Sequence, residues 1–303
     1  MTTRPFLTLP DGTLRAPWRL LAFGALTATV LSALAMMVGL VTPRPPGLSE
    51  SAWIFLAALV AAHVVMVRRV DHLPWGAVGL GLTHAAPHLL GQGIALGAVT
   101  IGVPSVVLLG TGLLRSHTVP GSAADWWRYA GRMTTLLLPA ALWEELAFRG
   151  YPFAVLRRAI GAPAALLATS VLFGVAHAQN LPSAGVLPLV LVGVAGMFLG
   201  AVLLVTGSLW ATWMTHFAWN WVMAALLHTE VSGVLQQPPD YRVVDAGPAW
   251  LTGGVWGPEG GIPAGLGMAT GLAYLVARRP RAQPTGAAFP DPREHPHGRR
   301  QDD

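Results

Sequence analysis

The amino-acid sequence predicts an all-α polytopic membrane protein, with about eight transmembrane helices that enclose a polar site within the membrane. Hydrophobic residues make up 53% of the 303 residues, charged residues only 11%, and the mean hydropathy is +0.53. A soluble domain would carry roughly 25% charged residues. One apolar run also contains three ionisable side chains, in WEELAFRG at residues 143–150, which is where we expect the polar site.

The net charge of +5 does not point to a nucleic-acid partner, and we expect none. All 19 basic residues are arginines, and they lie between apolar runs, whereas a DNA-binding protein clusters its cations on one face. The chain has no cysteine, which excludes disulfides, thiolate nucleophiles and metals held by cysteine.

The first apolar run has some features of a secretory signal, because Arg15 and Arg19 precede it and it contains the small-residue sequence ALA at 33–35. The run continues to Val41, however, which is long for a signal peptide and sufficient to cross a membrane. We therefore expect an uncleaved helix after a cytoplasmic segment at 1–17.

Eight runs are long enough to cross about 30 Å of hydrocarbon. They lie near residues 18–42, 52–68, 90–114, 130–157, 162–181, 185–206, 208–228 and 260–278. If the N-terminus is cytoplasmic, 14 of the 19 arginines lie on the cytoplasmic side and five on the other. This asymmetry predicts an integral protein of a bacterial-type plasma membrane, surrounded by membrane lipids, with both termini cytoplasmic.

The remaining segments are too polar or too broken to span. Residues 73–91, LPWGAVGLGLTHAAPHLLG, contain His84 and His88 and resemble an interfacial stretch; residues 229–258 form a long non-cytoplasmic loop. The Pro-rich residues 279–303 are expected to be a disordered cytoplasmic tail. We find no internal repeat, and expect one helical domain over 18–278 with a motif-bearing core at 130–228.

Only two of the 14 acidic residues, Glu144 and Glu145, lie well inside a predicted span. An ionisable group in a membrane helix costs at least a few kcal/mol, so it indicates a functional site. Glu145 and Arg149 are four residues apart and share a helix face, where an ion pair lowers the cost of burying both charges. Glu144 points elsewhere, about 100° around the helix, and has no local partner.

A partner for Glu144 is expected from the next helix. The turn at 160–163, IGAP, would join two antiparallel helices. Glu144 lies 14 residues before Arg158, beside the turn, and His177 lies 14 residues after Pro163. Both side chains would then lie about 21 Å from the turn. His216 and Asn220, four residues apart in the seventh run, share one helix face.

Each of these residues has a structural interpretation when taken alone. A single buried histidine, such as His63 or His177, is usually a core residue bonded to a backbone carbonyl, and Asn220 could join two helices. Together they fit hydrolysis of an acyl bond, in which Glu144 and His177 activate water while His216 and Asn220 stabilise the oxyanion. Zinc is the alternative use of Glu144, His177 and His216, although the HExxH motif is absent.

Three short motifs resemble those of the CAAX prenyl endopeptidase and bacteriocin-processing (CPBP, or Abi) family. EELAFR at 144–149 matches its EExxxR motif, FGVAH at 173–177 its FxxxH motif, and HFAWN at 216–220 its HxxxN motif. They occur in the family's order in successive hydrophobic segments, and an eight-helix layout is also similar to that family. The first 130 residues carry no matching motif.

The resemblance implies an intramembrane endopeptidase that acts on a peptide or a lipidated protein. Glu144 and His177 would activate the water, His216 and Asn220 would stabilise the oxyanion, and Glu145 and Arg149 would support the site. Members have been described both as metal-dependent and as glutamate-dependent without metal; we favour no cofactor, with zinc as the alternative. The alternative functions are a non-catalytic bacteriocin-immunity or scaffold protein of the same fold, and a proton-relaying transporter, although transporters usually contain repeats.

Overall fold

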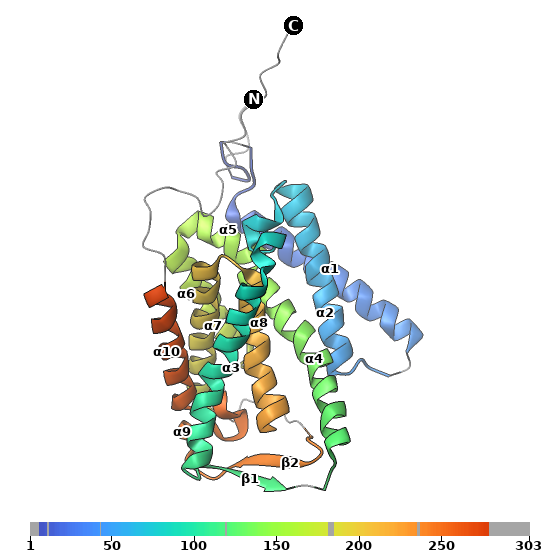
Figure 1. Ribbon diagram of the computed structural model, residues 1–303. Helices are drawn as coiled ribbons and strands as arrows, with labels where there is room; N and C mark the ends of the chain where they lie inside the picture. Colours follow the sequence, from blue (N-terminus) through green and yellow to red (C-terminus); the bar gives the residue numbers. More distant parts are fainter. Residues whose placement is uncertain are drawn as a thin grey trace.

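The computed structural model describes residues 6–10, 12–42, 44–118, 120–180, 185–234 and 237–278, and these form a bundle of helices with one small two-stranded sheet (Figure 1). The predicted tail at 279–303 lies outside the described residues. The long helices are α1 Ala16–Val41, α2 Leu48–His63, α3 Pro87–Gly110, α4 Ala123–Arg149, α5 Tyr151–Ile160, α6 Ala162–Ala176, α7 Val186–Thr206, α8 Leu209–Trp221 and α10 Ile262–Arg278. Two π-helical segments, η1 Val64–Val70 and η5 Val222–Leu227, extend α2 and α8.

Four described helices are both long and apolar enough to cross a membrane, which supports an integral membrane protein. They are α1, α2 with its π-helical extension (Leu48–Val70), α3 and α7. The other helices at the predicted positions are shorter or carry more polar residues; α6, for example, has 15 residues. The predicted number of about eight spans is therefore not confirmed by length and composition.

The predicted helix at 130–157 is wrong as a single helix, because the chain breaks at Gly150 between α4 and α5. Pro152 follows two residues later, and it has no N–H to bond to the carbonyl of Phe148, so a helix cannot continue here without losing a bond. The break is also tightly packed: a Cβ on Gly150 would lie 2.3 Å from Nε2 of His63. The predicted helix at 162–181 likewise ends early, at Ala176, so that His177 follows its last turn.

His63 of α2 stabilises the new helix start after this break. Its Nδ1 is 2.8 Å from the carbonyl oxygen of Leu59, and its Nε2 accepts a hydrogen bond of 3.0 Å from the backbone N–H of Tyr151. The first N–H groups of a helix have no partner within the helix, so the imidazole supplies one. His63 is therefore a buried core histidine, as expected, with the additional role of capping α5.

Helices α3 and α8 pack with their backbones almost in contact. A Cβ on Gly93 would lie 2.3 Å from the carbonyl oxygen of Ala211, and one on Gly97 would lie 2.1 Å from that of Thr215. These two glycines form a GxxxG pair, the spacing that lets membrane helices approach closely. The contact fixes the rotation of α8, which carries His216 and Asn220.

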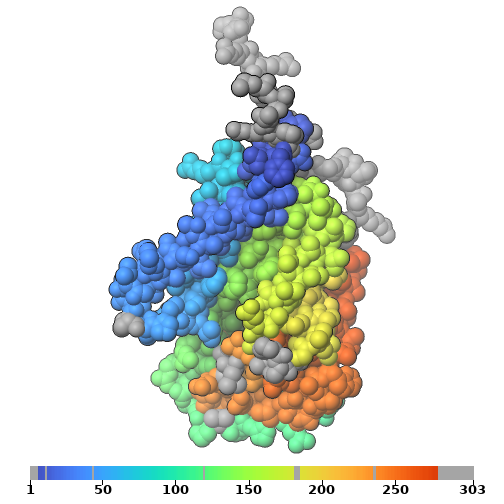
Figure 2. All heavy atoms as spheres, turned by 180° about the vertical axis from the view of Figure 1, so that it is seen from behind, coloured from blue at the N-terminus to red at the C-terminus, as the bar shows by residue number. Residues whose placement is uncertain are grey.

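The buried apolar residues form two main clusters on either side of α4. One joins α3, α4, α7, α8 and α10, and the other joins α1, α2, α4, α5 and α6. Helix α1 is the most peripheral: it leans along the outside of the bundle with its far end away from the other helices (Figures 1 and 2). The α4 residues next to Glu144 and Glu145 belong to the second cluster or pack against it: Leu142, Trp143, Leu146 and Ala147.

A short two-stranded antiparallel sheet, which the sequence analysis did not predict, closes one end of the bundle (Figure 1). Strand β1 (Leu114–Thr118) pairs with β2 (Tyr241–Asp245), so that Leu114 lies opposite Asp245. The predicted 229–258 loop thus contains β2, followed by α9 (Ala249–Thr252) and the 3-10 turns η6 (Gly254–Trp256) and η7 (Pro258–Gly260). The predicted interfacial stretch contains two further 3-10 turns, η2 (Trp75–Val78) and η3 (Leu82–Ala85).

Candidate active site

The predicted ion pair between Glu145 and Arg149 is present and fully buried. Nη1 of Arg149 lies 3.4 Å from Oε1 of Glu145, and both side chains have 0% exposure. Nη2 of Arg149 also donates a 3.0 Å hydrogen bond to the carbonyl oxygen of Gly196 in α7, and the guanidinium lies 4.3 Å from the ring centre of Phe173. Several partners thus offset the cost of burying the guanidinium, which a single ion pair would not do.

Glu144 faces two histidines from two other helices. Its Oε2 lies 3.8 Å from Nε2 of His177 and 3.8 Å from Nε2 of His216, and it has no hydrogen-bond partner among the described residues. The structure therefore brings together Glu144 and His177, which the sequence analysis placed at one depth, and adds His216 of α8 to them. The helix break at Gly150 does not prevent this, because α6 still returns alongside α4.

The remaining nitrogens of the two imidazole rings fix how each ring is oriented. Nδ1 of His177 lies 2.8 Å from the carbonyl oxygen of Phe173, one turn earlier in α6. Nδ1 of His216 lies 2.8 Å from Oε1 of Glu145. Both partners are acceptors, so Nδ1 carries a hydrogen on each ring and Nε2 is directed toward Glu144. The sequence analysis did not predict the bond between His216 and Glu145.

This geometry places three acceptor atoms around one point when both histidines are neutral. A carboxylate oxygen and two Nε2 lone pairs cannot bond to one another, so the point requires a donor: a water molecule or an additional proton. The charges lead to the same conclusion. Glu144 and Glu145 carry two negative charges against one positive charge on Arg149, and a single proton shared by Glu144, His177 and His216 makes the buried group neutral.

Asn220 lies one turn beyond His216 on α8. Both residues line a small cavity whose volume is about 30 Å³. This is enough room for a water molecule. The side-chain amide of Asn220 is 9% exposed and makes no hydrogen bond to the described residues, so its N–H groups are free to bind an oxygen in the cavity. His177 and His216 line the cavity with it.

A further carboxylate in the cavity wall, Glu259 of η7, was missed by the sequence analysis. Its Oε2 accepts a 2.9 Å hydrogen bond from Nε1 of Trp219, and its Oε1 accepts two bonds of 2.7 Å from the N–H and hydroxyl of Ser232. The carbonyl oxygen of Ser232 in turn accepts a 3.1 Å bond from Asn180, just beyond His177. Glu259 therefore joins α8 to the loops on either side of the site.

The sequence did contain a weak signal for Glu259. It is the one acidic residue in a glycine-rich stretch at 253–261, but it lies at the edge of a predicted span and not inside one. The glycines around it allow backbone conformations that the hydrophobic pattern does not indicate; Gly253, Gly254 and Gly257 all have positive φ.

The described residues do not form a metal centre. No three of their histidine, aspartate and glutamate side chains lie close enough together to hold an ion. Glu144, His177 and His216, the set named for zinc, approach one another only at the two 3.8 Å distances. On the absence of such a group among the described residues, no step below is assigned to a metal.

Comparison with known protein families agrees with the motif resemblance. Residues 126–222 match the family described as type II CAAX prenyl endopeptidase, Rce1-like. The matched segment contains all three motifs, with the six predicted site residues, and supports a peptidase at the level of the family. No curated protein and no solved structure matches the chain.

Proposed function

We propose that this chain is an intramembrane endopeptidase that hydrolyses a peptide bond with a water molecule held by Glu144. The observation that carries the proposal is the unpartnered Oε2 of Glu144, which faces Nε2 of both His177 and His216. The similarity to CAAX prenyl endopeptidases over residues 126–222 gives the same reaction class. No observation favours the non-catalytic immunity or scaffold alternative.

The first step is attack by water on the scissile carbonyl carbon. Glu144 accepts a proton from the water. Nε2 of His177 accepts a hydrogen bond from the same water, which directs a lone pair of the water oxygen at the carbonyl carbon. A bond forms between the water oxygen and the carbonyl carbon, and the π electrons of the carbonyl move onto the carbonyl oxygen. The N–H group of Asn220 and a protonated Nε2 of His216 donate to this oxyanion.

The second step breaks the carbon–nitrogen bond. The oxyanion electrons re-form the carbonyl, the amine leaves, and Glu144 returns its proton to that amine, so no proton is gained or lost overall. Glu145 is a positioning residue: its bond to Nδ1 directs Nε2 of His216 into the site and stabilises a proton there. Arg149 pairs with Glu145 and lowers the cost of burying its carboxylate.

The proposed topology retains about eight membrane-crossing segments. Helix α8 with its π-helical extension covers 19 residues, and α4 with α5 can cross as one bent segment. Both termini are placed in the cytoplasm of a bacterial-type cell by the arginine distribution. The substrate is a peptide or a lipidated protein that reaches the site from the membrane, and nucleic acid has no part in the function.

Cleavage by the purified protein tests the proposal. We would use fluorogenic peptides with plain and lipidated C-termini, and compare wild type with Glu144→Gln and with Glu50→Gln, which changes an exposed glutamate outside the site. We expect Glu144→Gln to abolish turnover with unchanged thermal unfolding, because it removes the base and keeps the shape. Unchanged turnover in Glu144→Gln would refute the proposed base.

A chelator added to the same assay tests the cofactor. We propose a reaction without a metal cofactor, so turnover should survive the chelator. Turnover that is lost with chelator and restored by zinc would instead assign Glu144, His177 and His216 as zinc ligands, and would refute the direct role of Glu144 as the base.

A further inference from the structure

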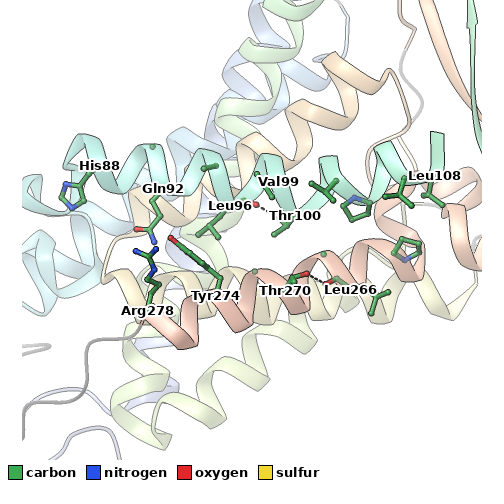
Figure 3. Close-up of a pocket in the computed structure, with 18 residues that line it drawn as sticks. His88, Gln92, Leu96, Val99, Thr100, Leu108, Leu266, Thr270, Tyr274 and Arg278 are labelled. Carbon is green, nitrogen blue, oxygen red and sulfur yellow. Dashed lines mark hydrogen bonds between the residues drawn. The ribbon is translucent and has the colours of Figure 1, made fainter. Parts of the chain in front are cut away.

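A long apolar groove runs along the seam between α3 and α10 (Figure 3), and none of its lining residues lines the cavity of the candidate active site. Its volume is about 1000 Å³, at the upper end of typical ligand sites. From His88 to Leu108 its α3 wall is about 30 Å long, at 1.5 Å per residue. The side chains along it are mostly small or aliphatic, among them Ala95, Val99 and Val103.

The two hydroxyl groups in the middle of the groove are already hydrogen-bonded to the backbone. The hydroxyl of Thr100 donates to the carbonyl oxygen of Leu96 at 2.5 Å, and that of Thr270 donates to Leu266 at 2.6 Å (Figure 3). Pro104 leaves the carbonyl of Thr100 without its helical donor. Gly267 covers that oxygen: a Cβ added to Gly267 would lie only 2.0 Å from it. The middle of the groove thus suits hydrocarbon better than water or a peptide backbone.

One end of the groove is different, because polar and charged side chains gather there (Figure 3). His88 and Gln92 come from the first turns of α3, and Tyr274 and Arg278 come from the last turns of α10. Figure 3 shows the side chains of Gln92 and Arg278 pointing toward each other. The guanidinium of Arg278 lies 5.2 Å from the ring centre of Tyr274. This end can bind an anion with a guanidinium, an imidazole and an amide.

We propose that the groove binds one membrane phospholipid with a net negative headgroup. Its phosphate contacts Arg278 and His88, and an acyl chain lies along the apolar walls past Ala95 and Val99. The charge at one end of the groove matches the headgroup of such a lipid, and the apolar walls beyond it match the acyl chain. Arg278 lies near the cytoplasmic membrane surface in the proposed topology, where headgroups are found.

The proposed lipid site is independent of the proposed peptidase activity. Helix α10 separates the two: Gly267 and Gly271 line the groove, whereas Met268 lines the catalytic cavity. A Cβ on Gly271 would lie 2.8 Å from Cε2 of Phe198, which also lines that cavity. A bound lipid would therefore support the cavity wall from behind without touching Glu144.

Native mass spectrometry of the full chain in detergent can count the bound lipid. We would titrate wild type with phosphatidylglycerol and with phosphatidylcholine, and repeat this for Ala95→Trp, which fills the groove, and Arg278→Gln, which removes the cation. The matched controls are Ala273→Trp, an exposed alanine on α10 outside the groove lining, and Arg132→Gln, an exposed arginine on α4.

We expect one phosphatidylglycerol to bind wild type and both controls, about tenfold more tightly than phosphatidylcholine. Ala95→Trp and Arg278→Gln should each weaken this binding by about tenfold, and thermal unfolding without lipid identifies any variant that fails to fold. Equal binding of both lipids, or unchanged binding in both groove variants, would overturn the proposal and leave only general contact with the bilayer. Retention of a lipidated peptide in place of phosphatidylglycerol would also overturn it, in favour of a substrate groove.

Discussion

Replacing Arg149 by alanine tests whether the buried charges of the site balance as described. The change removes an ion pair with Glu145, a hydrogen bond to Gly196 and a contact with the ring of Phe173. Breaking a buried pair by removing one partner costs about 3–5 kcal/mol, because the other charge stays buried. The ring contact adds about 1–2 kcal/mol in a desolvated position, and the contributions overlap, so we expect a total of about 5 kcal/mol.

This loss of stability can be measured by thermal unfolding in detergent. One kcal/mol shifts the Tm of a chain of 150–250 residues by about 2–4 °C, so Arg149→Ala should lower Tm by about 10 °C or more. Arg128→Ala is the matched control: Arg128 pairs with Asp125 on the same helix, but its side chain is 75% exposed. An exposed pair contributes at most about 1 kcal/mol, and Tm should change by a few degrees or less.

A second substitution separates charge from packing. Glu145→Gln in the Arg149→Ala background removes the stranded negative charge, while its amide oxygen can still accept the bond from Nδ1 of His216. We expect the double variant to unfold at a higher temperature than Arg149→Ala alone. If Arg149→Ala unfolds within 2 °C of Arg128→Ala, or if Glu145→Gln lowers Tm further, the argument from buried charge is refuted.

Three other substitutions test the parts of the site separately. Asn220→Ala should lower kcat by about 10²–10³ without changing thermal unfolding, as expected for an oxyanion donor, and a loss below about tenfold would contradict that role. Gly150→Ala should lower the free energy of unfolding by about 1–3 kcal/mol, because the new Cβ would lie 2.3 Å from Nε2 of His63. Its control is Gly131→Ala in α4, where a Cβ meets nothing within 4 Å and should raise the free energy of unfolding by up to about 1 kcal/mol. Equal Tm values for the two variants would contradict the packing around Gly150. Glu259→Ala should lower Tm more than Glu259→Gln, which keeps an acceptor for two of the three donors, and the reverse order would show that the hydrogen bonds are not what stabilises the loop.

The part of the site that helix periodicity controls could be predicted from the sequence. Glu145 and Arg149 pair because residues four apart share a face, and the same spacing places Asn220 beside His216. The proximity of Glu144 to His177 followed from counting residues away from a turn, although the intervening segment is broken at Gly150. Local geometry is enough for these contacts.

The bond between His216 and Glu145 could not be predicted in this way. It depends on how α8 is rotated against α4, and that rotation is fixed by the close approach of α8 to the glycines of α3. The position of Glu259 depends on a loop whose glycines have positive φ, and the cap from His63 depends on where α2 passes the broken helix. Each is a tertiary contact between segments far apart in the sequence, and a single sequence does not encode such contacts in its periodicity.

The glycine contact between α3 and α8 restricts how a substrate can enter the site. Gly93 and Gly97 touch backbone atoms of α8, so there is no layer of side chains between the two helices that could rearrange to open a path. The opposite side of α8 meets α4 through side chains, for example Trp213, whose Nε1 donates to the carbonyl oxygen of Leu138 at 2.9 Å. Side chains can change rotamer on the timescale of binding, whereas two backbones in contact move together. A peptide would therefore enter between α8 and α4 or past the loop held by Glu259, with α3 and α8 moving as one unit.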